Sequence, residues 1–120
     1  MIKSFRDLEV YQESYDLMIE IHELVKKFPV FERNDIVSQM RRAPKSCPAN
    51  IAEGWAKRRF EKEFKRHLDA SIGSANEMEV HLDSSRDLNY INSEIANLLT
   101  KRYSLLGGKL TNLQKNWKTF

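Results

Sequence analysis

The residues best suited to chemistry in this sequence are the cations that lie between Arg41 and Arg66. That stretch holds nine Lys or Arg residues and three Glu residues, a net charge of +6, whereas the whole chain of 120 residues carries +3. Basic character concentrated in this way predicts an electrostatic footprint for a polyanion such as RNA or DNA. The alternative is a solvated helix face without a ligand. The candidate nucleic-acid-binding residues are Arg41, Arg42, Lys45, Arg58, Arg59, Lys62, Lys65 and Arg66.

Aromatic side chains lie among these cations. Trp55 precedes Arg58 and Arg59, and Phe60 follows them, which is an arrangement that can stack on unpaired bases. Because Trp and Phe at helical spacing are more often core residues, we expect Trp55 to pack and Phe60 to be the more exposed. A second basic zone follows Leu99, where Lys101, Arg102, Lys109, Lys115 and Lys118 occur with no acid.

Asn50 and Glu53 are three residues apart and therefore share a helix face. They lie in a stretch of small residues where solvent should be scarce. A lone buried carboxylate is costly, so we interpret Glu53 as paired with an arginine such as Arg42, and the two residues as a structural polar pair. A binding or catalytic carboxylate is the alternative.

Catalytic and metal-binding patterns are missing from the sequence. None of His22, His67 and His81 follows a glutamate by three residues, as a carboxylate-bridged di-metal bundle requires. Neither G-x-x-x-x-G-K-[ST] nor G-x-G-x-x-G occurs. Cys47 is the only cysteine; Lys45 could lower its thiol pKa, but a packing role is favoured. We therefore expect no enzyme, no metal and no cofactor.

The composition predicts a single domain over residues 1–120. The chain is 41% hydrophobic with few Gly and Pro residues, and this length can bury a sizeable core. The beginning of the chain lacks the apolar run of a secretory signal, and no stretch approaches the length of a membrane span. A single cysteine fits a reducing compartment. We therefore expect a cytoplasmic protein without membrane contact.

Hydrophobic periodicity predicts four helices, and the short links between them favour an all-α, antiparallel up-down-up-down four-helix bundle. Ser4 and Asp7 have capping spacing ahead of a first helix that Pro29 ends near Phe28. The second helix begins near Asn34 or Asp35 and runs to about residue 57. It should kink or restart at Pro44 and Pro48, with Ser46, water or a 3₁₀ turn satisfying the freed carbonyls.

The third helix is expected over residues 61–88 and the fourth after an Asn92 cap. Small residues at 49–56 and 70–75 predict that the second and third helices cross closely, although Gly54 could instead end the second helix. Gly107 and Gly108 mark a bend or a close contact in the fourth helix. Its expected inward residues are Ile95, Leu98, Leu99, Leu105 or Leu106, Leu110, Leu113 and Trp117.

Five blocks of the sequence are distinctive: FRDLEVYQ (5–12), FP (28–29), SQMRRA (38–43), PANIAEG (48–54) and KEF-x-R-x-L (62–68). Together they resemble a known family of bacterial four-helix bundle proteins. The family includes the intervening-sequence proteins encoded within large-subunit ribosomal RNA genes and the accessory variability protein of diversity-generating retroelements. The similarity covers nearly the whole chain.

The resemblance implies a cylindrical homopentamer with a basic surface. The retroelement member binds nucleic acid and a reverse transcriptase. Two departures from the family bear on the helices. Pro44 stands where members usually have another residue, which affects the straightness of the second helix. Phe60 stands where serine is frequent, so the third helix should lack its usual N-cap.

These observations give three functional hypotheses from different classes. The leading one is a non-enzymatic homo-oligomer that binds RNA or DNA mainly through phosphates. The second is a protein-interaction scaffold that docks a polymerase, such as a reverse transcriptase, or another acidic partner. The third is a hydrolase that uses Glu53.

Overall fold

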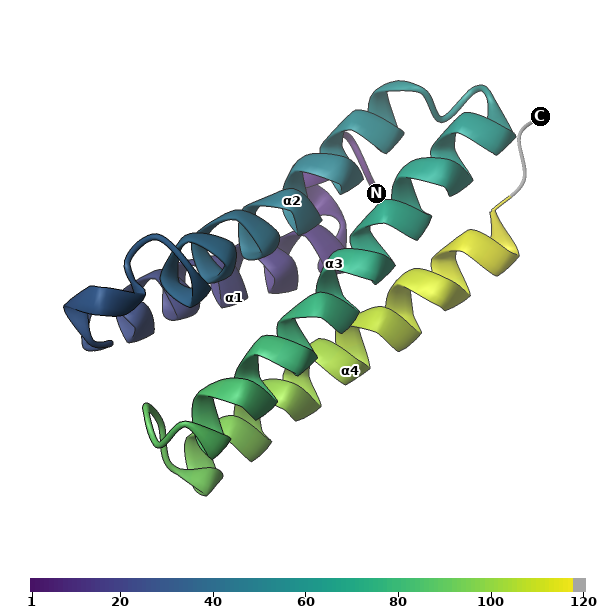
Figure 1. Cartoon of the computed structure of the whole chain (residues 1–120). Helices are drawn as coiled ribbons and strands as arrows, with labels where there is room; N and C mark the ends of the chain where they lie inside the picture. The colour runs from purple at the N-terminus through teal and green to yellow at the C-terminus, as the bar shows by residue number, and fades with distance from the viewer. Residues whose placement is uncertain (118–120) are drawn as a thin grey trace.

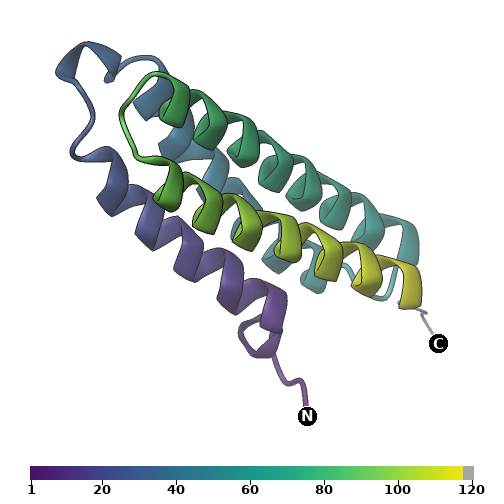
Figure 2. The same cartoon turned by 90° about the horizontal axis from the view of Figure 1, so that it is seen from below.

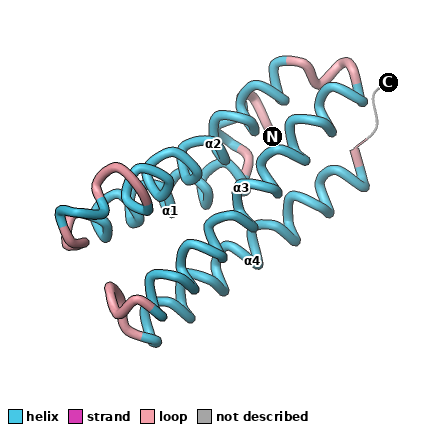
Figure 3. Tube along the Cα trace, viewed as in Figure 1, coloured by secondary structure: helices cyan, strands magenta, loops and turns pink. Residues whose placement is uncertain are grey.

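Four helices account for nearly all of the chain in the computed structural model, which describes residues 1–117 (Figures 1 and 3). They are α1 (Glu9–Val25), α2 (Ile36–Ala56), α3 (Glu61–Asp87) and α4 (Ser93–Asn116), with short 3₁₀ turns η1 (Phe5–Asp7) and η2 (Val30–Glu32). The described part of the chain contains no strand. Each helix packs against its neighbours in sequence, and α4 also contacts α1. The predicted all-α four-helix bundle is confirmed.

Local signals set most of the helix boundaries. The Asn92 side chain accepts a hydrogen bond of 2.8 Å from the Ile95 backbone N–H and thereby caps α4 as predicted. Ser4 and Asp7 do form a capping box, but it caps η1 rather than α1. Asp35 is the N-cap of α2 without a side-chain cap hydrogen bond. α1 ends at Val25, three residues earlier than the sequence predicts.

The helix α2 continues through both of its prolines. Pro44 and Pro48 are buried within an α-helix that is uninterrupted from Ile36 to Ala56, so of the two predicted outcomes, kinking or restarting, restarting is excluded. The Ser46 hydroxyl, expected to satisfy a freed carbonyl, instead accepts hydrogen bonds from Asn50 and Ser74. Burial of the two rings against the core offsets part of the cost of the missing backbone donors.

The contact between α2 and α3 is close at selected positions only. The Cys47 thiol donates to the Ser71 carbonyl and the Ser71 hydroxyl to the Cys47 carbonyl, at 3.6 and 2.8 Å. A Cβ on Gly54 would lie 3.0 Å from the Cβ of His67. Gly54 thus lies within α2 rather than at its end, and its lack of a side chain allows α3 to approach closely. Other small residues predicted for this crossing, such as Ala49 and Gly73, are exposed.

The inward face of α4 differs from the prediction. Leu99 and Leu110 are buried as expected, and Leu106 is the buried member of the alternative Leu105 or Leu106. Leu113 and Trp117 are partly buried against the core. Ile95 and Leu98, however, are exposed, and Tyr103 takes a core position. Gly107 and Gly108 lie in unbroken helix, and a Cβ on either would meet nothing within 4 Å. The expected close contact at these glycines is therefore absent within the described chain.

The helix α1 does not reach the end of the bundle that is formed by the turn between α2 and α3 (Figures 1 and 2). The molecule measures 50 × 24 × 22 Å, and α1, with 17 residues, is the shortest helix. Figures 1 and 2 show that α1 begins short of the turn between α2 and α3, so this turn and the end of α4 project beyond it. Most of the candidate cations lie at this projecting end.

Candidate nucleic-acid interface

The turn between α2 and α3 is held by its own backbone. The N–H of Lys57 donates to the Gly54 carbonyl at 3.0 Å, and the N–H of Phe60 donates to the Lys57 carbonyl at 2.9 Å. The Trp117 indole N–H donates to the Arg58 carbonyl at 3.3 Å, which ties the turn to α4. These hydrogen bonds fix the backbone of the turn, and so the positions from which its side chains extend.

An aromatic cluster supports the turn from inside. Trp117 lies against Trp55 and Phe64, with ring centroids 6.0 and 4.6 Å apart. The Arg58 guanidinium lies over the Trp55 ring, 4.2 Å from its centroid, and Arg58 also donates to the Trp55 carbonyl. Trp55 is partly buried against the core, so the prediction that it packs is confirmed.

Most of the candidate cations are accessible. Lys65 is half-buried and the other seven are exposed. Lys65 pairs with Glu61 at 3.4 Å and Arg66 pairs with Glu63 at 2.7 Å, which holds the pKa of the Glu63 carboxyl below its ordinary value. Within residues 1–117, no salt bridge is formed by Arg41, Arg42, Lys45, Arg59 or Lys62.

These cations come from two segments of the chain. Arg41, Arg42 and Lys45 lie in the middle of α2, whereas the others lie on the turn and the first turns of α3. At 1.5 Å per helical residue, Lys45 is about 20 Å from Arg58 along the axis, but α3 runs back along α2, and Arg66 adjoins His67, which contacts Asn50 of α2. Arg42 borders a shallow hollow of about 300 Å³ between α2 and α3, together with Gln39, Ser46, Ser74 and Glu77.

Two cations of the second basic zone, Arg102 and Lys109, are paired with acids of α1. Arg102 pairs with Glu20, and the Lys109 ammonium contacts Glu9 at 2.6 Å and Glu13 at 2.5 Å. The Lys109 contact lowers the pKa of the Glu9 carboxyl by hydrogen bonding and charge. These pairs join α1 to α4, so they serve the bundle itself. Lys118 lies outside the described residues.

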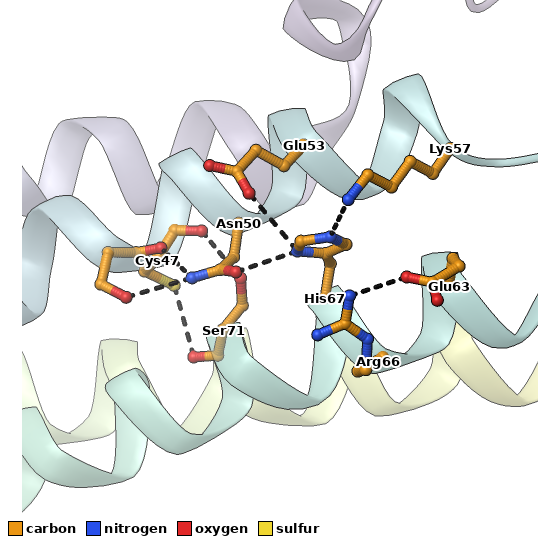
Figure 4. Close-up of polar contacts among 9 residues, drawn as sticks. Cys47, Asn50, Glu53, Lys57, Glu63, Arg66, His67 and Ser71 are labelled. Carbon is orange, nitrogen blue, oxygen red and sulfur yellow. Dashed lines mark hydrogen bonds and ion pairs between the residues drawn. The ribbon is translucent and has the colours of Figure 1, made fainter.

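The proposed Glu53 to Arg42 pair is wrong, because Glu53 faces a different partner. Figure 4 shows Asn50 and Glu53 of α2, and Lys57 just after its end, converging on His67 of α3. Asn50 Oδ1 lies 3.1 Å from His67 Nδ1, and the Glu53 carboxylate lies 3.7 Å from the same nitrogen. The Glu53 side chain is 64% exposed, so it has no burial cost to offset, and Asn50 carries the structural role.

The hydrogen bonds around His67 define its tautomer. The Lys57 ammonium, which can only donate, lies 3.2 Å from His67 Nε2. Nε2 therefore accepts a hydrogen bond from Lys57. The ring proton is on Nδ1, and this N–H donates a hydrogen bond to the Asn50 side-chain carbonyl oxygen. The Asn50 amide nitrogen in turn donates to the Ser46 carbonyl at 3.0 Å. Both ring nitrogens of this buried imidazole are thus satisfied.

His67 is the polar residue that sequence reasoning missed. It was considered only as a metal ligand and rejected. His67 is three residues after Phe64 and four before Ser71, which places it on the buried stripe of α3. This spacing was the signal in the sequence that His67 is buried. The partners, however, come from another helix, and the spacing within α3 does not identify them.

The Cys47 thiol and possible metal sites were the other candidates for chemistry. Burial raises the pKa of the Cys47 thiol to about 12, opposite to the lowered value that Lys45 could have produced. Within residues 1–117, no three His, Cys, Asp or Glu side chains are grouped so that they could hold a metal ion. None of the helices in this part of the chain has the length and apolar character needed to cross a bilayer.

A comparison with protein families identifies a family for this chain. The model of a family described as "23S rRNA-intervening sequence protein" matches residues 6–112. A search of curated proteins finds no match. The matched range includes all four helices up to the last turns of α4, together with every candidate cation of α2 and α3.

Proposed function

Because this chain belongs to the 23S rRNA-intervening sequence protein family, we propose that it is a non-enzymatic, oligomeric bundle that binds RNA or DNA in the cytoplasm. Contacts to phosphates, made by the candidate cations, provide most of the binding. The observation that carries this proposal is the set of exposed cations on α2 and α3 that lack acidic partners among the described residues.

The energetics of the exposed cations favour a ligand outside the chain. Where a cation stabilises the fold it is paired, as Lys109 is with Glu9 and Glu13. Arg59 and Lys62 are exposed without such pairs, so they contribute little to stability and retain their full charge for a polyanion. Binding of this kind releases counterions from the nucleic acid.

Salt dependence is the direct test. A fluorescently labelled, structured RNA is titrated with the protein at several salt concentrations, and log K is plotted against log salt. We expect a straight line whose slope grows with the number of phosphates neutralised. Absence of binding near physiological salt would contradict the proposal.

Charge-neutralising variants locate the interface. Replacing Arg59 and Lys62 together by Gln should reduce the slope by about 1.4 to 1.8, since each phosphate contact contributes about 0.7 to 0.9. The matched control replaces Lys101 and Lys115 of α4, which are also exposed. The proposal is wrong about location if the control variant loses as much slope as the first.

We propose that the protein assembles with itself, as a pentamer, through the α1–α4 side. Ile19, Ile95, Leu98 and Leu105 are exposed apolar residues on these two helices. A hollow of about 460 Å³ between the helices is lined by three of them. Apolar residues exposed together in this way favour a protein contact.

Light scattering after size exclusion tests the assembly. A pentamer should elute with the mass of five chains of 14.1 kDa. Leu98→Asp should reduce the mass, whereas Val80→Asp, at an equally exposed apolar position on α3, should not. A monomeric wild-type protein at micromolar concentration would exclude the proposal.

The second candidate function is a scaffold that docks a polymerase, such as a reverse transcriptase, or another protein. Val30 and Phe31 favour it, because they are 76% and 79% exposed at the end of the bundle opposite the basic turn. Capture from a lysate treated with nuclease separates this function from the first, since a protein partner remains bound after the nucleic acid is removed.

A further inference from the structure

Phe60 is an aromatic residue whose position the fold does not explain. Its side chain is 55% exposed and is not packed against the core. It is also the N-cap of α3 and makes no side-chain cap hydrogen bond, although Ser, Thr, Asp and Asn are the residues that stabilise this position. Leu8, the N-cap of α1, is equally unable to cap but is buried. Phe60 provides neither a cap nor core packing.

The backbone holds Phe60 firmly. Its N–H donates to the Lys57 carbonyl at 2.9 Å, and its carbonyl accepts from the Phe64 N–H at 3.0 Å. The Trp117 indole fixes the preceding part of the turn through the Arg58 carbonyl. An aromatic ring presented from an ordered backbone loses little conformational entropy when a ligand stacks on it.

The surroundings of the Phe60 ring are cationic. The Arg59 guanidinium lies over the ring at 5.0 Å from its centroid. Lys62 is exposed two residues later. An exposed aromatic face with neighbouring cations has the two features that bind single strands: a surface for a base and charges for the phosphates on either side.

We propose that Phe60 stacks on an unpaired base, so that the ligand bound at this end of the bundle contains single-stranded nucleotides. The inference rests on the proposed binding of nucleic acid, and it adds a base contact to the phosphate contacts. Stacking of this kind requires no particular base, since every base has an aromatic face.

The experiment compares two oligonucleotides that carry the same phosphates. One is oligothymidylate and the other is an abasic DNA strand of equal length, and their binding is measured by fluorescence anisotropy at one salt concentration. We expect wild-type protein to bind oligothymidylate more tightly. Phe60→Leu should lower that affinity about tenfold, the effect of one stacked base, and should leave the abasic strand unaffected.

Two further variants make the test specific. Tyr15→Leu is the matched control, because Tyr15 is an exposed aromatic residue on α1, and it should change neither affinity. Phe60→Ser should weaken oligothymidylate binding while raising the melting temperature by about 4 °C through a new N-cap. A loss of binding caused by misfolding would instead lower the melting temperature.

Each outcome decides between the proposals. Equal wild-type affinity for the two strands, or an unchanged affinity in Phe60→Leu, would overturn base stacking while leaving phosphate binding intact. Binding of neither strand and of no structured RNA would overturn both. A tenfold loss confined to the strand with bases supports the inference.

Discussion

Gly54 allows α3 to approach α2, and its replacement by alanine should therefore destabilise the protein. A Cβ at this position would lie 3.0 Å from the Cβ of His67, 3.3 Å from Cδ1 of Phe64 and 3.4 Å from the Phe64 carbonyl oxygen. The first and last of these atoms belong to, or adjoin, the backbone of α3. They can move aside only if the helix itself shifts.

The sign of the effect follows from two opposing terms. Alanine is a better helix former than glycine by about 1 kcal/mol, and no glycine in the described chain has a positive φ, so alanine meets no backbone strain. Overpacking of a tight contact costs about 1 to 3 kcal/mol. The net effect of Gly54→Ala is therefore a loss of about 1 kcal/mol in unfolding free energy.

Gly73 provides the matched control. It lies in the middle of α3, and a Cβ there would meet nothing within 4 Å. Only the helix-propensity term remains, so Gly73→Ala should stabilise the protein by about 1 kcal/mol. Because 1 kcal/mol corresponds to about 4 °C for a chain of this length, the two variants should melt about 8 °C apart, on opposite sides of the wild type.

Thermal unfolding followed by circular dichroism measures both variants at equal protein concentration. A rise in melting temperature for Gly54→Ala equal to that for Gly73→Ala would refute the close approach of the two backbones. A fall for Gly73→Ala would show that the exposed face of α3 is covered in solution, since the control has no contact within the chain.

Three more predictions follow from the polar and buried groups. With a pKa of about 12, the Cys47 thiol should not react with a disulfide reagent at pH 8 until the protein unfolds. Asn50→Leu leaves a buried imidazole N–H unpaired and should lower the unfolding free energy by about 1 to 3 kcal/mol, whereas Glu53→Gln should change it by under about 0.5 kcal/mol; urea midpoints compare them. The pKa of Glu9 is lowered by Lys109, so its contribution is complete above the ordinary value of 4.5 and is lost as pH falls through the lower folded pKa. Lys109→Met should return the Glu9 pKa toward 4.5 in an NMR titration.

Local signals in the sequence predicted the helices well. Asn92 and the connection through residues 58–60 act within a few residues, so they indicate boundaries without reference to the fold. Pro29 was less accurate, because it predicts an end near Phe28 and α1 ends at Val25. The third helix was predicted to begin at the residue where α3 begins, Glu61. The missing N-cap at Phe60 was also predicted correctly, because only the identity of one residue was needed.

Helix orientation was less predictable. α4 contains the adjacent leucine pairs 98–99 and 105–106, and one member of each pair must point away from the core. The sequence pattern favoured Leu98 as well as Leu99, but Leu98 is exposed and Tyr103 is buried. Which part of a wide apolar arc faces inward depends on where the other helices lie, and α4 meets α1 over a smaller area than it meets α3.

The candidate site was predicted in composition but not in arrangement. The sequence treats Arg41 to Arg66 as one basic stretch, and the structure distributes its cations over two antiparallel helices and their turn, because α2 remains helical through Pro44 and Pro48. The prolines each cost about 3 kcal/mol in an isolated helix. Tertiary packing overrides this local preference, and helix propensities alone do not include the effect of packing.

The same packing determines how the candidate interface behaves as a unit. Every candidate cation lies on α2, on α3 or on the turn between them. These two helices are joined by reciprocal hydrogen bonds between Cys47 and Ser71 and by the contact between Asn50 and His67. The relative positions of these cations are therefore fixed before any ligand binds. Under the proposed function, a nucleic acid that contacts cations on both helices must match this arrangement, so the protein would select among ligands by their shape as well as by their charge.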